Sequence, residues 1–469
     1  MSQNEHFLDI FFNPRSVAIV GASTNPDRLN YSLVNNLLKF NFPGEVYPVN
    51  PTAGEVLGLK AYPSVKDIEA DVDLAVISVS SNNTMDIVRD CVAKGVKGVT
   101  IVAGGFSEIG DPGRRKQDEV RDLLRKNNVR AIGPNSLSPI NTAKNFAISF
   151  NSMEKLKQGH LAFVFQSGLY DPRINWMFSE FNLRLSKLID LGNKMDINEV
   201  DALEYLAQDS ETKVIAMHME SIAGDGRKFL QLLKDTTPEK PVIILKTGRT
   251  EAGIRAASSH TGALVRGSDL VFDAAIKQSG AIRAQSLEEF FDLAKAFEFL
   301  GPLTGNRIAI ATLPGGEAVI TADLCQERGF TLAEVAPETR EKLRRLFPPW
   351  EIAVNPFDIG VCGQFHSHEE VYRVFLRSMV DDPNIDCLAV QLMMRDLPGF
   401  EEFLESFLLA KERHKPLALW APGGPQGRFG IVDWLEERGI PLYRSADAVI
   451  KVLAALKTYS IMQGTFQEL

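Results

Sequence analysis

The residue best suited to carry a chemical group is His260, which lies in a run of small residues from Ser258 to Ala263. Small side chains pack weakly and Gly262 leaves the backbone free, so we expect this histidine to be mobile. A neutral imidazole is a nucleophile near pH 7 and can accept a transferable group. The alternative is an ordinary histidine in a surface turn, and the segment alone leaves both interpretations open.

A second candidate is Glu220, which directly follows a predicted strand at Lys213–Met219. A carboxylate at this end of a sheet can accept the imidazole N–H, fix its tautomer and stabilise positive charge on a modified ring. A solvated loop glutamate is the alternative. His218 is expected to be a packed strand histidine.

Parallel α/β sheets have to position these residues, because short apolar strands alternate with helical patterns along the chain. The predicted strands are Ser16–Val20, Glu45–Val49, Leu74–Val79, Gly98–Val102, Val129–Ile132, Leu161–Phe165, Leu185–Leu191, Lys213–Met219, Pro241–Lys246, Arg307–Thr312, Cys387–Met393, Pro416–Trp420 and Ile440–Tyr443. The predicted helices include Ser32–Phe40, Asn82–Lys94, Val200–Gln208 and Gly226–Asp235. We therefore predict three doubly wound domains at 6–145, 155–300 and 303–465, separated by turn-rich linkers at 151–158 and 301–305.

The composition agrees with such an organisation and excludes several protein classes. A chain of 469 residues fits about three domains, and its formal net charge of −9 argues against binding nucleic acid. The four cysteines are scattered without metal-ligand spacing, so we expect reduced, mostly buried thiols and no metal site. We find no signal peptide and no apolar run long enough for a membrane span, which predicts a cytoplasmic protein without a membrane partner.

Open α/β sheets bind ligands at the carboxyl ends of their strands, and the first predicted strand leads into a small-residue turn at Gly21–Arg28. Its backbone N–H groups and the following helix suit a phosphate group. The turn is not GxGxxG, and Asn50-Pro51 stands where dinucleotide folds place an acid for the ribose. NAD is therefore a less suitable ligand than another nucleotide-bearing molecule. The alternative is that Gly21-Ala22 forms an ordinary turn with no ligand.

Three further loops at predicted strand ends contain glycine or amide groups that suit a ligand. They are the segments 103–108, with adjacent glycines, Gly133–Ser136, and Gln166–Gly168. Each loop is common by itself, but their shared position at strand ends favours a binding site.

In combination, these motifs resemble those of a known family. They occur in order as Phe12–Ser23, Tyr47–Pro51, Gly133–Asn135, Gln166–Gly168, Gly192-Asn193, Ser259–Ala263 and Asn355–Asp358. The chain resembles, from about Phe7 to Thr458, the α subunits of NDP-forming (ADP-forming) acyl-CoA synthetases of the succinyl-CoA synthetase superfamily. The resemblance implies a Rossmann-like CoA-binding domain followed by two flavodoxin-like domains, the second a ligase-CoA domain.

The resemblance also implies a reaction and a set of site residues. An acyl-CoA and phosphate give an acyl phosphate, its phosphoryl group moves to His260, and ADP then accepts it; the reverse direction makes the thioester. Glu220 would orient His260. Coenzyme A would be held by Gly21, Ser23, Asn25, Pro26, Arg28, Asn50, Pro51, Ser78, Val79 and Ser80. The acyl and phosphate groups would be held by Gly105, Phe106, Gly133, Pro134, Asn135, Gln166, Ser167 and Gly168.

The family's other half is an ATP-grasp module that binds ATP or ADP with Mg²⁺, and we find no such module in this sequence. A separate ATP-grasp β subunit is therefore implied, in an αβ or α₂β₂ complex. The implied substrates are coenzyme A and a small carboxylic acid. The sequence leaves open which acid it is, the direction of the reaction and the choice between ADP and GDP.

Several residues depart from the family pattern. Leu169–Pro172 replaces a run that opens a phosphate-binding helix, Asn30 replaces a glycine, and Ser136 replaces a cysteine. We expect Asp171 to cap the helix that begins at Pro172, with a charge that opposes bound phosphate unless it points away. The departures suggest an unusual acid substrate or a weakened catalyst. The alternatives to an enzyme subunit are a non-catalytic CoA- or acyl-CoA-binding regulator and, less suitably, a NAD-dependent dehydrogenase.

Overall fold

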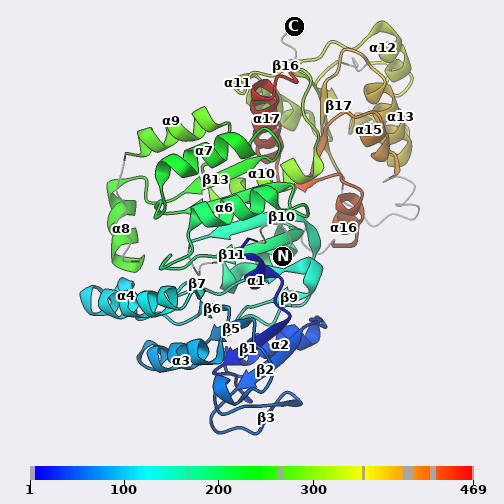
Figure 1. Ribbon diagram of the computed structural model, residues 1–469. Coiled ribbons are helices and arrows are strands. Elements are labelled where there is room, and N and C mark those ends of the chain that lie inside the picture. The colour runs from blue at the N-terminus through cyan, green and yellow to red at the C-terminus, as the bar shows by residue number, and fades with distance from the viewer. Residues whose placement is uncertain are drawn as a thin grey trace. The chain divides into compact units, whose positions relative to one another are not determined.

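The computed structural model describes residues 6–166, 168, 170–261, 268–350, 354–393, 405–422 and 429–466, with the side chains of 258–261 and 429 excepted. Its main elements are three sheets of parallel strands with helices between them (Figure 1). The chain divides into two compact units, one of residues 1–179 with 183–285 and one of residues 180–182 with 286–469. The first unit contains the first two sheets.

The first sheet has the strand order β2-β1-β5-β6-β7, and all its strands are parallel. The strands are β1 (Ser16–Val20), β2 (Glu45–Val49), β5 (Leu74–Ile77), β6 (Gly98–Ile101) and β7 (Arg130–Ile132), and the helices are α2 (Tyr31–Lys39), α3 (Ser81–Lys94) and α4 (Asp111–Lys126). Every residue of β1, β5 and β6 is buried, as expected for strands covered on both faces. The short hairpin β3 (Glu55–Val56) and β4 (Leu59–Lys60) lies outside this sheet.

The second sheet has seven strands in the order β14-β13-β12-β10-β11-β8-β9. Its parallel strands are β10 (Gln158–Phe165), β11 (Leu185–Asp190), β12 (Val214–Met219), β13 (Val242–Lys246) and β14 (Ile282–Ala284). Its helices are α5 (Ile174–Glu180), α6 (Glu199–Gln208), α7 (Gly226–Thr236), α8 (Glu251–Thr261) and α9 (Asp269–Ser279). The antiparallel strands β8 (Ile140–Asn141) and β9 (Phe146–Ala147) extend this sheet, although they precede the predicted linker.

The second unit contains a sheet in the order β16-β15-β18-β19-β20, with β17 also paired to β15. Its strands are β15 (Arg307–Thr312), β16 (Thr331–Leu332), β17 (Phe357–Asp358), β18 (Cys387–Gln391), β19 (Leu417–Trp420) and β20 (Leu442–Tyr443). Its helices include α10 (Leu287–Phe299), α11 (Gly315–Glu327), α12 (Pro337–Arg344), α13 (His368–Val380), α15 (Leu408–Glu412), α16 (Phe429–Glu437) and α17 (Ala446–Met462).

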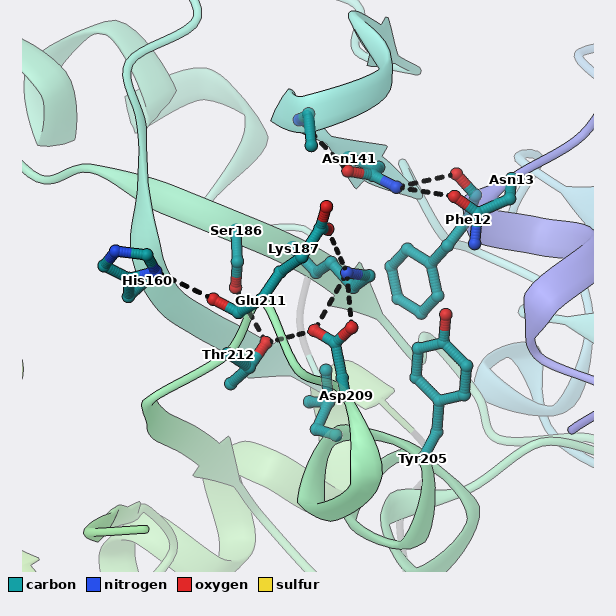
Figure 2. A network of polar contacts seen from close by, with 12 residues as sticks. Phe12, Asn13, Asn141, His160, Ser186, Lys187, Tyr205, Asp209, Glu211 and Thr212 are labelled. Carbon is teal, nitrogen blue, oxygen red and sulfur yellow. Dashed lines mark hydrogen bonds and ion pairs between the residues drawn. The ribbon is translucent and has the colours of Figure 1, made fainter.

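Buried polar contacts join the first two sheets inside the first unit. Asn141 Nδ2 on β8 donates to the Phe12 carbonyl at 3.1 Å and to Asn13 Oδ1 at 3.0 Å (Figure 2). The nearby Lys187 amino group on β11 pairs with Asp209 and Glu211 at 2.8 Å, with its side chain only 2% exposed. The Asn141 hydrogen bonds therefore attach the second sheet to the N-terminal segment. The Lys187 ion pairs attach β11 to the loop at 209–211 of the same domain, since a buried charge is stable only with partners.

The structure also bears on the expectations about the cysteines and about membrane-spanning segments. All four cysteines are buried and none is in a disulfide, which confirms the predicted burial. No helix among the described residues is long and apolar enough to cross a membrane.

Candidate functional site

The first candidate site lies where the strand order of the first sheet reverses, between β1 and β5, the place where open α/β sheets bind ligands. Gly21 follows β1 with φ of +88°, and a Cβ atom there would lie 2.5 Å from the Ser78 carbonyl oxygen. Asn50 Nδ2 donates to the Ala22 carbonyl at 2.9 Å. The structure therefore brings together three predicted residues from the ends of three strands, Gly21, Asn50 and Ser78.

The turn after Gly21 is held by its own polar side chains. The Asn25 amide donates to Ser23 Oγ at 3.1 Å, and the Asp27 amide donates to Asn25 Oδ1 at 2.9 Å. Pro26 and Arg28 are exposed. Asn30, the departure from the family's glycine, donates its side-chain amide to the Gly21 carbonyl, so this substitution closes the turn.

A second loop follows β6, and the Glu108 carboxylate accepts hydrogen bonds from backbone amides of this loop. Gly105, with φ of +96°, donates its N–H to Glu108 Oε1 at 2.5 Å, and Asn193 Nδ2 donates to Glu108 Oε2 at 2.6 Å. Burial raises the pKa of the Glu108 carboxyl, but these bonds and those from its own amide and the Phe106 amide leave it below its usual value. The Phe106 side chain is fully buried. An anion bound by the Gly105 amide therefore has to displace a carboxylate.

The loops that end β7 and β11 lie against each other. The Asn193 amide donates to the Pro134 carbonyl at 2.9 Å, and a Cβ atom on Gly192 would lie 2.2 Å from the same oxygen. Asn135, with φ of +62°, donates its amide to the Ala103 carbonyl at 3.1 Å. The candidate ligand loops of the first and second sheets are thus in direct contact, which the sequence did not predict.

Asp190, the last residue of β11, is buried and hydrogen-bonded to the residues on either side of this contact. Its carboxylate accepts the Leu137 amide at 3.3 Å and the Gly192 amide at 3.1 Å. Burial raises its pKa to about 7, since the two hydrogen bonds compensate only part of the lost hydration.

The second sheet reverses its strand order between β10 and β12, and the two strand ends carry Gln166 and Glu220. Gln166 Oε1 accepts the Glu220 amide at 2.8 Å and the Ser221 amide at 3.1 Å. Gln166 and Glu220 are 5% and 9% exposed. A Cβ atom on Gly168 would meet no atom of the described chain within 4 Å, and Ser167 lies outside the described residues.

His260 lies on the last turn of α8, because the helix continues through Thr261. Residues 258–261 are thus helical, and the alanine and serine residues that precede His260 are compatible with a helix. The expected mobility of His260 stays a prediction. The His260 side chain, Gly262 and Ala263 lie outside the described residues. Helix α8 packs against the 3₁₀ turn Ser107–Ile109, so the helix that carries His260 is in contact with the loop of Glu108.

Two predictions about neighbouring residues can be compared with the structure. His218 is a packed strand histidine as predicted: it is 4% exposed, its Nε2 lies 3.1 Å from Thr247 Oγ1, and burial lowers its pKa to about 4. Asp171 is not a helix cap, since it is the first residue of a 3₁₀ turn, Asp171–Arg173, in which Tyr170 occupies the N-cap position. Its carboxylate accepts Ser149 Oγ at 2.5 Å and Asn151 Nδ2 at 3.1 Å, and these donors hold the charge in place of the helix end.

The sequence showed no sign of Lys194, and it assigned no role to Glu108 or Asn193, although both lay within candidate loops or motifs. Gly192-Asn193 was part of the motif set, which was the only signal for this loop. Glu108 lies in the candidate loop 103–108, but its contact with the Gly105 amide depends on the positive φ of that glycine.

Comparisons with known proteins agree with this geometry. Family models match residues 15–141 as a CoA binding domain, 158–297 as a succinyl-CoA ligase like flavodoxin domain and 308–394 as a ligase-CoA domain. The chain is 39% identical over 455 residues to the α subunit of acetate–CoA ligase [ADP-forming] II from Pyrococcus furiosus, covering 96% of this chain and 97% of that one. It is 33% identical to 4-hydroxybutyrate–CoA ligase [ADP-forming] from Nitrosopumilus maritimus, covering 96% of this chain and 64% of that protein.

The fold is also similar to a solved structure. The dinucleotide forming acetyl-coenzyme A synthetase 1 from Ca. Korarchaeum cryptofilum, in complex with phosphate and ADP, has a TM-score of 0.85 and 32% identity, with 98% of each chain covered. A relative of this identity over nearly the whole of both chains identifies the family. The chain belongs to the ADP-forming acyl-CoA ligases of the succinyl-CoA synthetase superfamily, as a chain of the α-subunit type.

Proposed function

We propose that this chain carries the phosphohistidine of an ADP-forming acyl-CoA ligase at His260 and works with a separate ATP-grasp β subunit. The observation that carries the proposal is the contact between Gln166 and the Glu220 amide at 2.8 Å. This contact supports the proposal because it joins Gln166, at the end of β10, to the backbone of Glu220, at the end of β12, where the strand order reverses.

In the thioester-forming direction, an imidazole nitrogen of His260 attacks the γ-phosphorus of ATP, and the bond to ADP breaks. The substrate carboxylate then attacks this phosphorus, the N–P bond breaks, and an acyl phosphate forms. The CoA thiolate attacks the acyl carbon, and inorganic phosphate leaves with the C–O electron pair. Glu220 accepts the N–H of the other ring nitrogen and stabilises the charged ring.

The first domain would bind coenzyme A at the β1/β5 reversal. Gly21 and Asn50 fix the backbone of the turn, and the exposed Arg28 supplies a cation for a phosphate group. Gly133–Asn135 and Gln166–Gly168 would hold the acyl and phosphate groups. We further propose that the chain forms three domains, at 6–145, 155–300 and 303–465.

We assign the nucleotide and Mg²⁺ to the partner, in an αβ or α₂β₂ complex. The chain covers 97% of the Pyrococcus protein, whose name as an α subunit supports a separate partner, and 64% of the Nitrosopumilus ligase. The acid is a small carboxylic acid.

The test is phosphorylation of the chain copurified with its β partner, using ATP and Mg²⁺. We expect an acid-labile, base-stable phosphate at His260, discharged by coenzyme A with one acid from a panel. The His260→Gln variant should lose the label, and the His160→Gln control, which changes an exposed histidine of the same domain, should keep it. An unlabelled chain beside a partner that is active on another α chain would contradict the relay and favour a CoA-binding regulator.

A further inference from the structure

Lys194 is a buried cation that the relay described above does not use. It lies in the loop after β11, in the left-handed region with φ of +54°, and its side chain is only 4% exposed. A lysine buried this deeply is expensive unless every donor of its amino group finds an acceptor. Its partners therefore indicate what it holds in place.

The Lys194 amino group contacts the ends of two neighbouring strands at once. It donates to Gln166 Oε1 at 2.9 Å and to the Ser221 carbonyl at 2.6 Å. The same Gln166 oxygen accepts the amides of Glu220 and Ser221. With these donors directed at Oε1, the orientation of the Gln166 side-chain amide is fixed.

The third partner of the amino group is Glu199 Oε2, at 3.0 Å. Glu199 is in the first turn of α6, is 1% exposed, and accepts the Ala223 amide at 2.5 Å and the Gly224 amide at 2.9 Å through Oε1. The ion pair thus connects the loop after β11 with the whole segment from Glu220 to Gly224. Burial lowers the pKa of Lys194, and the Glu199 charge opposes that effect.

We propose that Lys194 is a positioning residue, which holds the Gln166 side chain and the Glu220–Gly224 loop in the arrangement that phosphoryl transfer at His260 requires. This inference rests on the proposed function, because it concerns the same site. Lys194 acts through the Gln166 side chain and through the backbone of Glu220. It thereby fixes the positions of the loop proposed to bind phosphate, Gln166–Gly168, and of the Glu220 backbone.

The test compares Lys194→Met with a matched control, Lys187→Met. Lys187 is also buried, lies on β11 of the same sheet and pairs with two carboxylates, but it stands in the cluster beside Asn141 (Figure 2). Both variants lose a buried lysine and leave carboxylates without their cation. A loss of folding stability should therefore be common to both, and a loss of positioning should be specific to Lys194.

Two readouts on the αβ complex separate these effects. We expect Lys194→Met to slow the phosphorylation of His260 by ATP at least tenfold per folded molecule, with the half-saturating ATP concentration unchanged, whereas Lys187→Met keeps the wild-type rate. We also expect faster amide hydrogen exchange at residues 220–224 in Lys194→Met alone. The double variant Lys194→Met/Glu199→Gln removes the unpaired charge and keeps acceptors for the two loop amides, so it should recover stability but not the labelling rate.

A wild-type labelling rate in Lys194→Met, or unchanged exchange at residues 220–224, would overturn the positioning role while the relay stands. Recovery of the rate in the double variant would also overturn it, since the defect would then come from the unpaired Glu199 alone. An unlabelled wild-type chain with an active partner would instead overturn the relay, and the positioning role for phosphoryl transfer with it.

Discussion

Glu108 Oε1 lies 2.5 Å from the amide nitrogen of Gly105, so the carboxylate of this loop binds the backbone N–H of the same loop. Asn193, from the loop after β11 of the second sheet, donates to the other carboxylate oxygen at 2.6 Å. A single side chain thus fixes a glycine turn of the first sheet and attaches it to the second. Helix α8, which carries His260, packs on this turn, and any change in Glu108 acts on all three elements.

The first prediction concerns the stability that Glu108 supplies. Glu108→Ala leaves the Gly105 amide and the Asn193 side chain without their charged acceptor, so we expect the free energy of unfolding at pH 7 to fall by about 1–3 kcal/mol. Because the folded-state pKa of Glu108 is lowered, this stability is present above its unfolded pKa of about 4.3 and is lost as pH falls through the folded value. Urea unfolding at pH 7 and at lower pH measures both effects.

The control for this variant is Glu119→Ala, which removes an exposed carboxylate from α4. It should change the free energy of unfolding by no more than about 0.5 kcal/mol. Equal losses in the two variants, or a difference between them that grows towards low pH, would show that the Glu108 hydrogen bonds do not stabilise the loop.

The second prediction concerns the turn assigned to coenzyme A. In Gly21→Ala the new methyl group would lie 2.5 Å from the Ser78 carbonyl oxygen, and the alanine would have to adopt the φ of +88° of Gly21. Both the steric overlap and the backbone conformation are unfavourable. We expect a loss of about 1–3 kcal/mol in stability and at least about a tenfold weaker binding of coenzyme A, measured by calorimetric titration. In Gly54→Ala the methyl group meets no atom of the described chain within 4 Å, and binding should be unchanged.

The sequence was sufficient to predict the large parallel strands and the helices between them. Strand β1 and strand β15 begin and end where the apolar runs do, because buried parallel strands are continuous apolar segments. The sequence did not predict β8 and β9, since two-residue strands carry no periodic signal. The pairing of β8 with β11, and of β9 with β8, is decided by tertiary contacts.

The candidate site divides in the same way. Placing Gln166 and Glu220 at strand ends followed from the α/β pattern. The structure adds that the two strands are neighbours and that a hydrogen bond joins Gln166 to the Glu220 amide. Lys194 was not recognisable, because a charged residue in a loop is usually exposed. Only its left-handed backbone conformation turns its side chain towards Glu199 and Gln166.

The last prediction concerns pH and Asp190. Its folded-state pKa of about 7 lies above the unfolded value of about 3.9, so the folded chain holds a proton that the unfolded chain releases between these pH values. Stability therefore falls as pH rises from about 4 to about 7, and the loss is complete above the folded pKa. Asp190→Asn removes this titration, so between pH 4.5 and pH 8 the difference in unfolding free energy should move by about 2–4 kcal/mol in favour of the variant, as measured by urea unfolding. A wild-type chain whose stability relative to this variant does not change with pH would show that Asp190 is ionised throughout, held by the amides of Leu137 and Gly192.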